Sequence, residues 1–171
     1  KKFLEQACLS DLLEMTNLKL ANPGLFEEET GTNSEIKEFV IGIITFLSSI
    51  HSSFQSQEVL TNVTDFFIVL VALSESQMES WSSDFNDFVL IEAELSGTLS
   101  IRDTIYDFIS EMSLSANNSI TLLVTEKLTS GQFNNDFVKL EASLFLFGCC
   151  NSVVVSDRDE DTGSLQANST E

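Results

Sequence analysis

Few side chains in this sequence are of the types that catalyse reactions. His51 is the only histidine, and Cys8, Cys149 and Cys150 are the only cysteines. A serine or cysteine nucleophile needs an activating base within hydrogen-bond reach, and the sequence around His51, SSIHSS, shows no spacing typical of such a pair. Closely spaced Cys and His ligands for zinc are also missing. We therefore expect a protein that is not an enzyme and that binds no cofactor.

An acidic stretch near the C-terminal end, DRDEDTG, has part of the ligand spacing of a calcium loop. Asp157, Asp159 and Asp161 stand at alternate positions, as the first three ligands of such a loop do. Gly163 is then at the seventh position rather than the sixth, and Asn168 is at the twelfth, where the loop needs a glutamate. The three aspartates are an incomplete calcium candidate, and a solvated acidic linker is the alternative.

The three cysteines allow two interpretations. Cys8 lies near the start of the chain, and Cys149 and Cys150 follow the last apolar pattern, so one disulfide could join the two ends of the domain. The third thiol would then be left to link two chains. Alternatively, all three are reduced and pack as small apolar side chains, as in a cytosolic protein.

Three Asn-X-Ser/Thr sequons occur, at Asn62, Asn117 and Asn168. The flanking sequence SANNSI predicts a loop around Asn117, and Asn168 lies in the polar end of the chain, so both should be accessible to glycosylation. Asn62 falls inside a predicted helix and is a poorer acceptor. With the odd number of cysteines, these sequons favour a secreted glycoprotein with a disulfide.

The charge is strongly acidic: 27 acidic side chains against 8 basic ones give a net charge of −19. Such a surface repels phosphate backbones and anionic headgroups, so we expect no nucleic acid partner. The longest apolar runs, at 39–47 and 66–73, are much shorter than the ~20 residues that span a bilayer, so we expect no membrane insertion. With 43% hydrophobic residues and 1 proline, the chain should be ordered.

Apolar residues recur with a helical period through most of the chain. This period predicts helices over 3–20, 36–50, 59–73, 81–95, 101–112, 120–128 and 133–147. The β-branched residues in VTDFFIVLVAL (63–73) favour a strand, but the spacing outweighs that preference. Thr32 with Glu35, and Ser100 with Asp103, have the spacing of helix-capping pairs. We predict an all-α fold, a compact bundle of about six or seven amphipathic helices over 1–148, with an extended acidic tail over 149–171.

Several predicted helices share an acidic residue followed by phenylalanine and further apolar positions. DFVLIEAEL at 87–95 and DFVKLEASL at 136–144 agree at six of nine positions. The steps between these segments are too uneven for a regular solenoid. The pattern fits either an old duplication of one helix or the general form of an amphipathic helix that begins with an acidic residue.

Two hypotheses of function follow from these observations. The first is a secreted, non-catalytic structural module that associates with copies of itself or with other extracellular components. Acidic pH or divalent cations would promote this assembly by neutralising crowded carboxylates. The alternative is an extracellular carrier that holds a small hydrophobic ligand in a cavity, although the same rings could form a close-packed core. The candidate cavity residues are Phe66, Phe67, Phe88, Phe108, Phe137 and Phe145.

Overall fold

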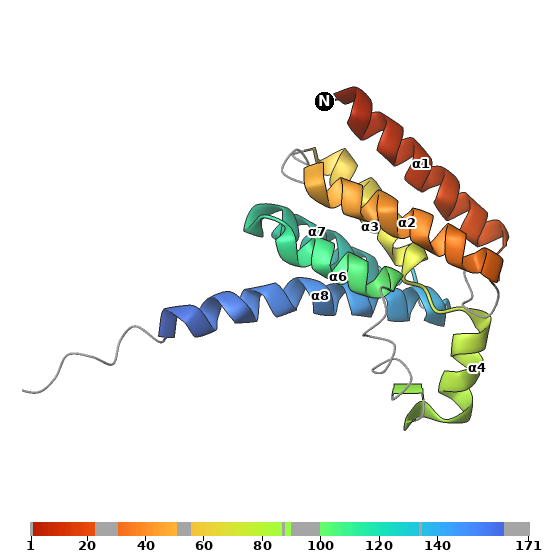
Figure 1. Cartoon of the computed structure of the whole chain (residues 1–171). Coiled ribbons are helices and arrows are strands. Elements are labelled where there is room, and N and C mark those ends of the chain that lie inside the picture. Colours follow the sequence, from red (N-terminus) through yellow and green to blue (C-terminus); the bar gives the residue numbers. More distant parts are fainter. Residues whose placement is uncertain are drawn as a thin grey trace, which may run out of the picture.

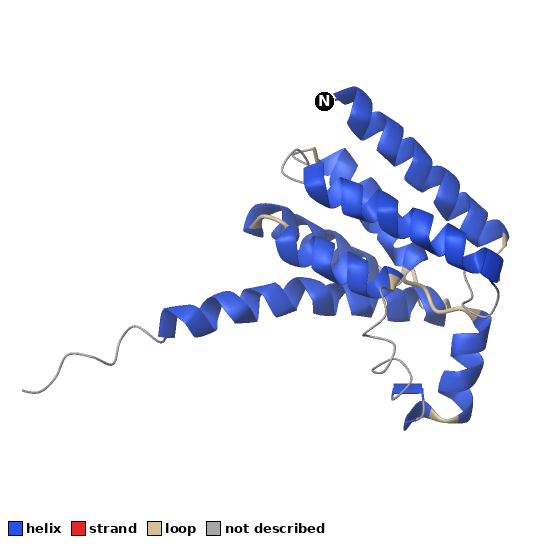
Figure 2. Cartoon of the chain, in the orientation of Figure 1, coloured by secondary structure: helices blue, strands red, loops and turns tan. Residues whose placement is uncertain are grey.

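The computed structural model of the chain describes residues 2–22, 31–50, 56–86, 88–89, 100–133 and 135–162. Within these ranges the regular structure consists of helices without a strand, so the predicted all-α class is confirmed (Figure 2). The helices are α1 (Lys2–Ala21), α2 (Gly31–Ile50), α3 (Gln57–Leu70), α4 (Glu75–Ser83), α6 (Ile101–Glu111), α7 (Leu114–Thr129) and α8 (Phe137–Thr162).

The helices form two rows that lie against each other. In one row α1 packs on α3 and α3 packs on α7, and in the other α2 packs on α6 and α6 packs on α8. Contacts of α8 with α3 and α7 join the rows at one end of the stack. Figure 1 shows α1 at the opposite end, with α2, α3, α6 and α7 between. The arrangement is therefore a layered stack, and it does not confirm the compact bundle that the sequence predicted.

Helix α3 lies at the centre of this stack because it is apolar on nearly every side. Leu60, Val63, Phe67 and Leu70 are among its buried residues, and Phe67 is completely inaccessible to solvent. The Phe67 ring meets Phe108 of α6 edge-on, with 5.1 Å between ring centroids, and so links the two rows. Burial against both rows explains why this β-branched sequence is helical despite its strand preference.

No single helix among the described residues is long and apolar enough to span a membrane. Only α3 and α4 taken together, as a pair bent by 59°, have the necessary length and composition.

Side-chain caps fix several helix starts. The Ser100 hydroxyl accepts a hydrogen bond from the backbone N–H of Asp103 at 3.0 Å and donates to its carboxylate at 2.7 Å, which confirms the predicted start there. Helix α4 begins with a reciprocal pair that we did not predict, formed by Ser74 and Gln77. The predicted cap at Thr32 is wrong, because that residue lies inside α2.

The segment that follows α3 leaves the stack. We predicted one helix over 81–95, but α4 ends at Ser83, and Asp84 has an extended backbone with φ −150° and ψ 98°. The hydroxyls of Ser82 and Ser83 bind carbonyls of the preceding turn, and such side-chain bonds compete with the backbone and end a helix. Figure 1 shows α4 projecting away from the two rows. Residues 90–95 of the predicted helix lie outside the described part.

Helix α8 is longer than the sequence suggested. It continues to Thr162, so the extended conformation that we predicted from residue 149 onward is wrong up to this point. No glycine or proline occurs between Cys149 and Thr162, and therefore nothing local stops the helix. The remaining tail residues, 163–171, lie outside the described part.

Two basic side chains bind the C-terminal end of α3, where backbone carbonyls lack partners within the helix. Lys19 of α1 donates to the carbonyls of Leu70 and Ala72 at 2.7 and 3.1 Å. Arg102 of α6 donates twice to the carbonyl between them, that of Val71, at 3.0 and 2.6 Å. The end of α3 is therefore attached to one helix in each row.

Arg102 extends this junction to α8. Its guanidinium forms two hydrogen bonds with the Glu141 carboxylate, at 3.0 and 2.7 Å, and the two side chains are only 19% and 13% exposed. The guanidinium carbon also lies 4.7 Å from the centre of the Phe145 ring. We call Lys19, Arg102, Glu141 and the carbonyls of residues 70–72 the α3 junction. It joins α1, α3, α6 and α8 at one place.

Neutralising the acid of the α3 junction should destabilise the fold. The Glu141→Gln variant leaves the buried Arg102 guanidinium without its counter-charge, so the free energy of unfolding should fall by about 2 kcal/mol. Urea unfolding followed by circular dichroism measures this change. The control is Lys139→Gln, which removes a half-exposed ion pair with Asp136 and should cost less than about 0.5 kcal/mol. Equal losses in the two variants would contradict a structural role for the junction.

The same junction predicts how stability changes with pH. Burial lowers the pKa of Lys19 to about 8 from its ordinary value of 10.5, and the nearby Arg102 charge adds to the shift. Below pH 8 Lys19 is protonated in both the folded and the unfolded chain. Between pH 8 and 10.5 it is protonated only in the unfolded chain. The free energy of unfolding should therefore rise with pH across this window, by at most about 1.4 kcal/mol per pH unit.

The free energy of unfolding is measured against pH for the wild-type chain and for the Lys19→Met variant, which keeps every other titrating group. The difference between the two curves is the contribution of Lys19. A difference that stays flat between pH 8 and 10 would show that Lys19 keeps its ordinary pKa and is not buried.

Candidate protein-binding surface

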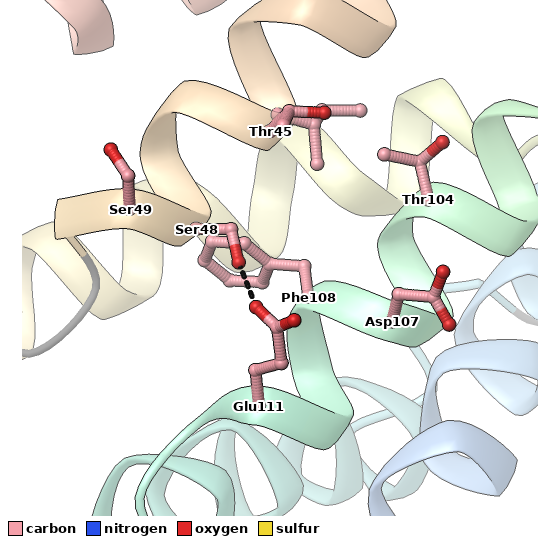
Figure 3. Close-up of a pocket in the computed structure, with 8 residues that line it drawn as sticks. Thr45, Ser48, Ser49, Thr104, Asp107, Phe108 and Glu111 are labelled. Atoms are coloured by element: carbon pink, nitrogen blue, oxygen red, sulfur yellow. Dashed lines mark hydrogen bonds between the residues drawn. The ribbon is translucent and has the colours of Figure 1, made fainter.

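A groove of about 380 Å³ lies between α2 and α6 (Figure 3). Its base includes Ile44 and Phe108, which are buried core residues of the two helices. Ser48 and Glu111 face each other and are joined by a hydrogen bond from the serine hydroxyl. The groove thus lies where two neighbouring helices of one row separate, and its lining residues are Ile44, Thr45, Ser48 and Ser49 of α2 and Thr104, Asp107, Phe108 and Glu111 of α6.

The polar groups of the groove are mainly hydrogen-bond acceptors. The hydroxyls of Thr45, Ser49 and Thr104 each donate to a carbonyl of their own helix, at 2.8, 2.6 and 2.7 Å. Their oxygen lone pairs can still accept bonds, and Asp107 and Glu111 add carboxylates. No lining residue is basic. This chemistry suits a partner that brings N–H donors or positive charge.

Large apolar side chains are exposed on the sides of α2 and α6 that face away from the groove. Phe39 and Phe46 of α2 are 55% and 42% exposed, and their spacing of seven residues places them on the same side of the helix. Tyr106 of α6 is 43% exposed. Between the two phenylalanines stands Gly42, where an added Cβ would meet no atom within 4 Å. Exposed aromatic residues are typical of surfaces that bind other proteins, although these three do not line the groove.

These groove residues were largely missed by the sequence analysis. Among them only Phe108 was a predicted site residue. The available signal was the spacing of Thr45, Ser48 and Ser49 on one side of an amphipathic helix. That spacing is equally typical of a solvated helix face, so sequence alone could not select it.

The sequence predicted a disulfide between Cys8 and one of the two cysteines of α8. Neither of these two α8 cysteines forms it. Cys149 and Cys150 are buried thiols in α8 and form no disulfide. Burial raises the pKa of Cys149 to about 12, with the neighbouring Cys150 adding to the shift. Burial also raises the pKa of Cys150, although a hydrogen bond with Thr121 opposes the rise. Both thiols therefore behave as small apolar core residues, while the Cys8 side chain lies outside the described part.

The predicted accessible sequon at Asn117 is wrong. The expected loop is instead part of α7, and the Asn117 side chain is completely buried. A folded chain has no room for a glycan at such a position. Asn62 is in α3 and half-buried, as its predicted place in a helix indicated, and Asn168 lies outside the described residues.

The incomplete calcium pattern does not form a loop. Asp157, Asp159 and Asp161 lie within the continuous helix α8. A calcium site of this kind instead requires a loop whose backbone curves around the ion, so that alternate residues can bind it. Among the side chains that the structure describes, no group of three or more His, Cys, Asp or Glu residues could hold a metal ion.

The six phenylalanines predicted to line one cavity are distributed over three places. Phe66, Phe67 and Phe108 are buried in the core, and only Phe108 reaches the groove. Phe88 and Phe137 contact Trp81 at the edge of the stack. The last one, Phe145, packs under the Arg102 guanidinium. The described residues therefore do not form the shared aromatic cavity of a ligand carrier.

Comparison with known proteins gives one relative at moderate similarity. The chain is 28% identical over 155 residues to importin subunit beta-5 of Saccharomyces cerevisiae. The alignment covers 91% of this chain but spans only 15% of the length of that protein. No protein-family model matches the sequence.

This similarity contradicts the predicted compartment and the functions tied to it. An importin subunit is, as its name says, part of nuclear import, which takes place inside the cell. The predictions of a secreted module, of an extracellular ligand carrier, and of a disulfide-bonded glycoprotein are therefore wrong. The coarser expectation of protein partners agrees with the similarity, whereas self-association and extracellular partners have no support from it.

Burial of the two α8 cysteines predicts low thiol reactivity. In the Cys8→Ser variant only Cys149 and Cys150 remain, and neither should react with a water-soluble disulfide reagent at pH 8 while the protein is folded. Both should react at once in denaturing guanidinium chloride, which also shows that they are reduced. Rapid labelling of the folded protein would contradict their burial in α8.

Proposed function

We propose that this chain is an intracellular, protein-binding part of a helical stack like those from which helical-repeat carriers are built. The observation that carries the proposal is the similarity to an importin subunit, which spans 91% of the chain. That span includes the helices that pack as two rows. Stacked helix pairs present extended surfaces to other proteins, because each pair contacts mainly its neighbours and leaves its outer side exposed.

The groove between α2 and α6 is the contact surface that we propose for such a partner. It combines an apolar base, Ile44 and Phe108, with a polar interior that holds two carboxylates. Aromatic side chains in the middle of an interface usually contribute most of its binding energy, while charges around them select the partner and raise the association rate. A segment of a partner protein with N–H donors and positive charge fits these requirements.

The proposal also includes the absence of catalysis. In the described groove the hydroxyls of Thr45, Ser49 and Thr104 are bonded within their own helices, and that of Ser48 is bonded to Glu111. No histidine, lysine or cysteine lines the groove to act as a base or nucleophile. Binding is the activity that these side chains support.

Photo-cross-linking tests the groove as a protein-binding surface. A photoreactive benzoylphenylalanine in place of Ser49 in the full chain should give discrete protein adducts in a cell extract. The charge reversals Asp107→Lys and Glu111→Lys should lower the adduct yield by about tenfold, because like charges across an interface are repulsive. Adducts are measured by gel mobility and identified by mass spectrometry.

The matched control carries the same photoreactive residue at Leu122, which is 71% exposed on α7 in the other row. Adducts of the groove variant should be missing from this control. The same adducts from both positions, or none from the groove, would overturn the proposed surface.

A further inference from the structure

A second group of aromatic side chains surrounds Trp81, the only tryptophan in the chain. Its ring centre lies 5.4 Å from that of Phe85, 5.2 Å from that of Phe88 and 5.9 Å from that of Phe137. Phe137 belongs to the first turn of α8, so this contact holds α4 against the edge of the stack. We call these four rings the Trp81 cluster.

Two of the four rings of the Trp81 cluster are open to solvent. Phe85 and Phe137 are 52% and 50% exposed on either side of the half-buried tryptophan, and only Phe88 is buried. Val89 adds a further apolar side chain that is 46% exposed. Exposed aromatic rings that gather at one place on a protein surface are unusual unless they bind something.

The segment between α3 and α6, which carries three of these rings, has no basic residue. Between Ser74 and Ser100 there are six acidic residues and no basic one: Glu75, Glu79, Asp84, Asp87, Glu92 and Glu94. Asp84 directly precedes Phe85, and one of its carboxylate oxygens accepts the backbone N–H of Asn86 at 3.0 Å, which holds this carboxylate against the backbone at Asn86. Asp136 also directly precedes Phe137, but its carboxylate is paired with Lys139, so Asp84 is the carboxylate on which the site depends.

Aromatic faces next to carboxylates attract one kind of side chain in particular. A guanidinium can stack on an aromatic ring and at the same time bind a carboxylate through parallel hydrogen bonds. The molecule already contains such a pairing, since Arg102 binds Glu141 and lies over Phe145. The Trp81 cluster offers the same combination of ring and carboxylate on the surface.

We propose that the Trp81 cluster is a docking site for an arginine-bearing, positively charged segment of a partner protein. Arginine side chains stack on Phe85 and Phe137, and Asp84 supplies a counter-charge. The site is separate from the groove between α2 and α6: α4 leaves the stack where α3 ends and α6 begins, whereas Ser48 and Glu111 lie near the opposite ends of α2 and α6. It therefore stands independently of the proposed groove function.

The single tryptophan makes a direct test possible. The full chain is titrated with a short synthetic peptide of alternating arginine and glycine, and the fluorescence of Trp81 is recorded. The proposal predicts a saturable change in emission that weakens with added salt. A peptide with glutamine in place of each arginine should give no change. Equal binding of the glutamine peptide, or no response to the arginine peptide, would overturn the proposal.

Two conservative variants separate the ring from the charge. Phe85→Leu keeps an apolar side chain but removes the aromatic face, and it should weaken binding by about fivefold. Asp84→Asn keeps the acceptor for the Asn86 N–H but removes the charge, and it should weaken binding by about threefold. Both variants retain Trp81 as the reporter, and the circular dichroism spectrum checks that they are folded.

The matched controls carry the same substitutions elsewhere. Phe39→Leu alters a ring on α2 of nearly the same exposure, 55% against 52%, and Asp11→Asn removes an exposed charge from α1. Neither should change the affinity. An equal loss in the controls would mean that the peptide responds only to the total charge of −19, and the site would be rejected.

Discussion

The hydrogen bonds at the end of α3 are the interaction on which the arrangement of this molecule depends. A helix that ends inside a protein exposes carbonyl groups that are costly to bury without partners. Here three consecutive carbonyls, those of residues 70–72, receive hydrogen bonds from Lys19 of α1 and Arg102 of α6. Because α1 and α6 belong to different rows, satisfying these carbonyls also fixes how the rows lie against each other.

The same junction determines where the binding surfaces lie. Glu141 compensates the Arg102 charge and thereby places the first turns of α8 beside α6. The first residue of α8, Phe137, can then reach the Trp81 ring and hold α4 at the edge of the stack. At the other end of α6 the hydrogen bond between Ser48 and Glu111 links α2 to α6, and the groove lies between these helices.

The helical class and most of the helices could be predicted from sequence because the apolar spacing is strong. For example, Val63 and Phe67 of α3 are one turn apart, and both are buried. The departure of α4 could not be predicted, since the aromatic pattern continues past Ser83 and only hydroxyl–carbonyl bonds end the helix. The loop predicted around Asn117 was wrong because a polar sequence can still be helical when its neighbours bury it.

The candidate surfaces were harder to predict for a physical reason. Each combines residues from helices that are far apart in sequence, such as Ser48 with Glu111, or Trp81 with Phe137. Periodicity shows which side of a helix is apolar but not which helices become neighbours. The predicted compartment was also wrong, because sequons and an odd cysteine count occur by chance in a chain of this length and report little about export.

Hydrogen–deuterium exchange of the full chain, read by mass spectrometry, tests the central claim most directly. If two rows of helices are organised around the end of α3, the amides of α3 should exchange more slowly than those of every other helix, and those of α4 should be among the fastest. Exchange in α3 as fast as in α4 would contradict the account, because a helix buried at the centre of the stack cannot open as easily as one that projects from it.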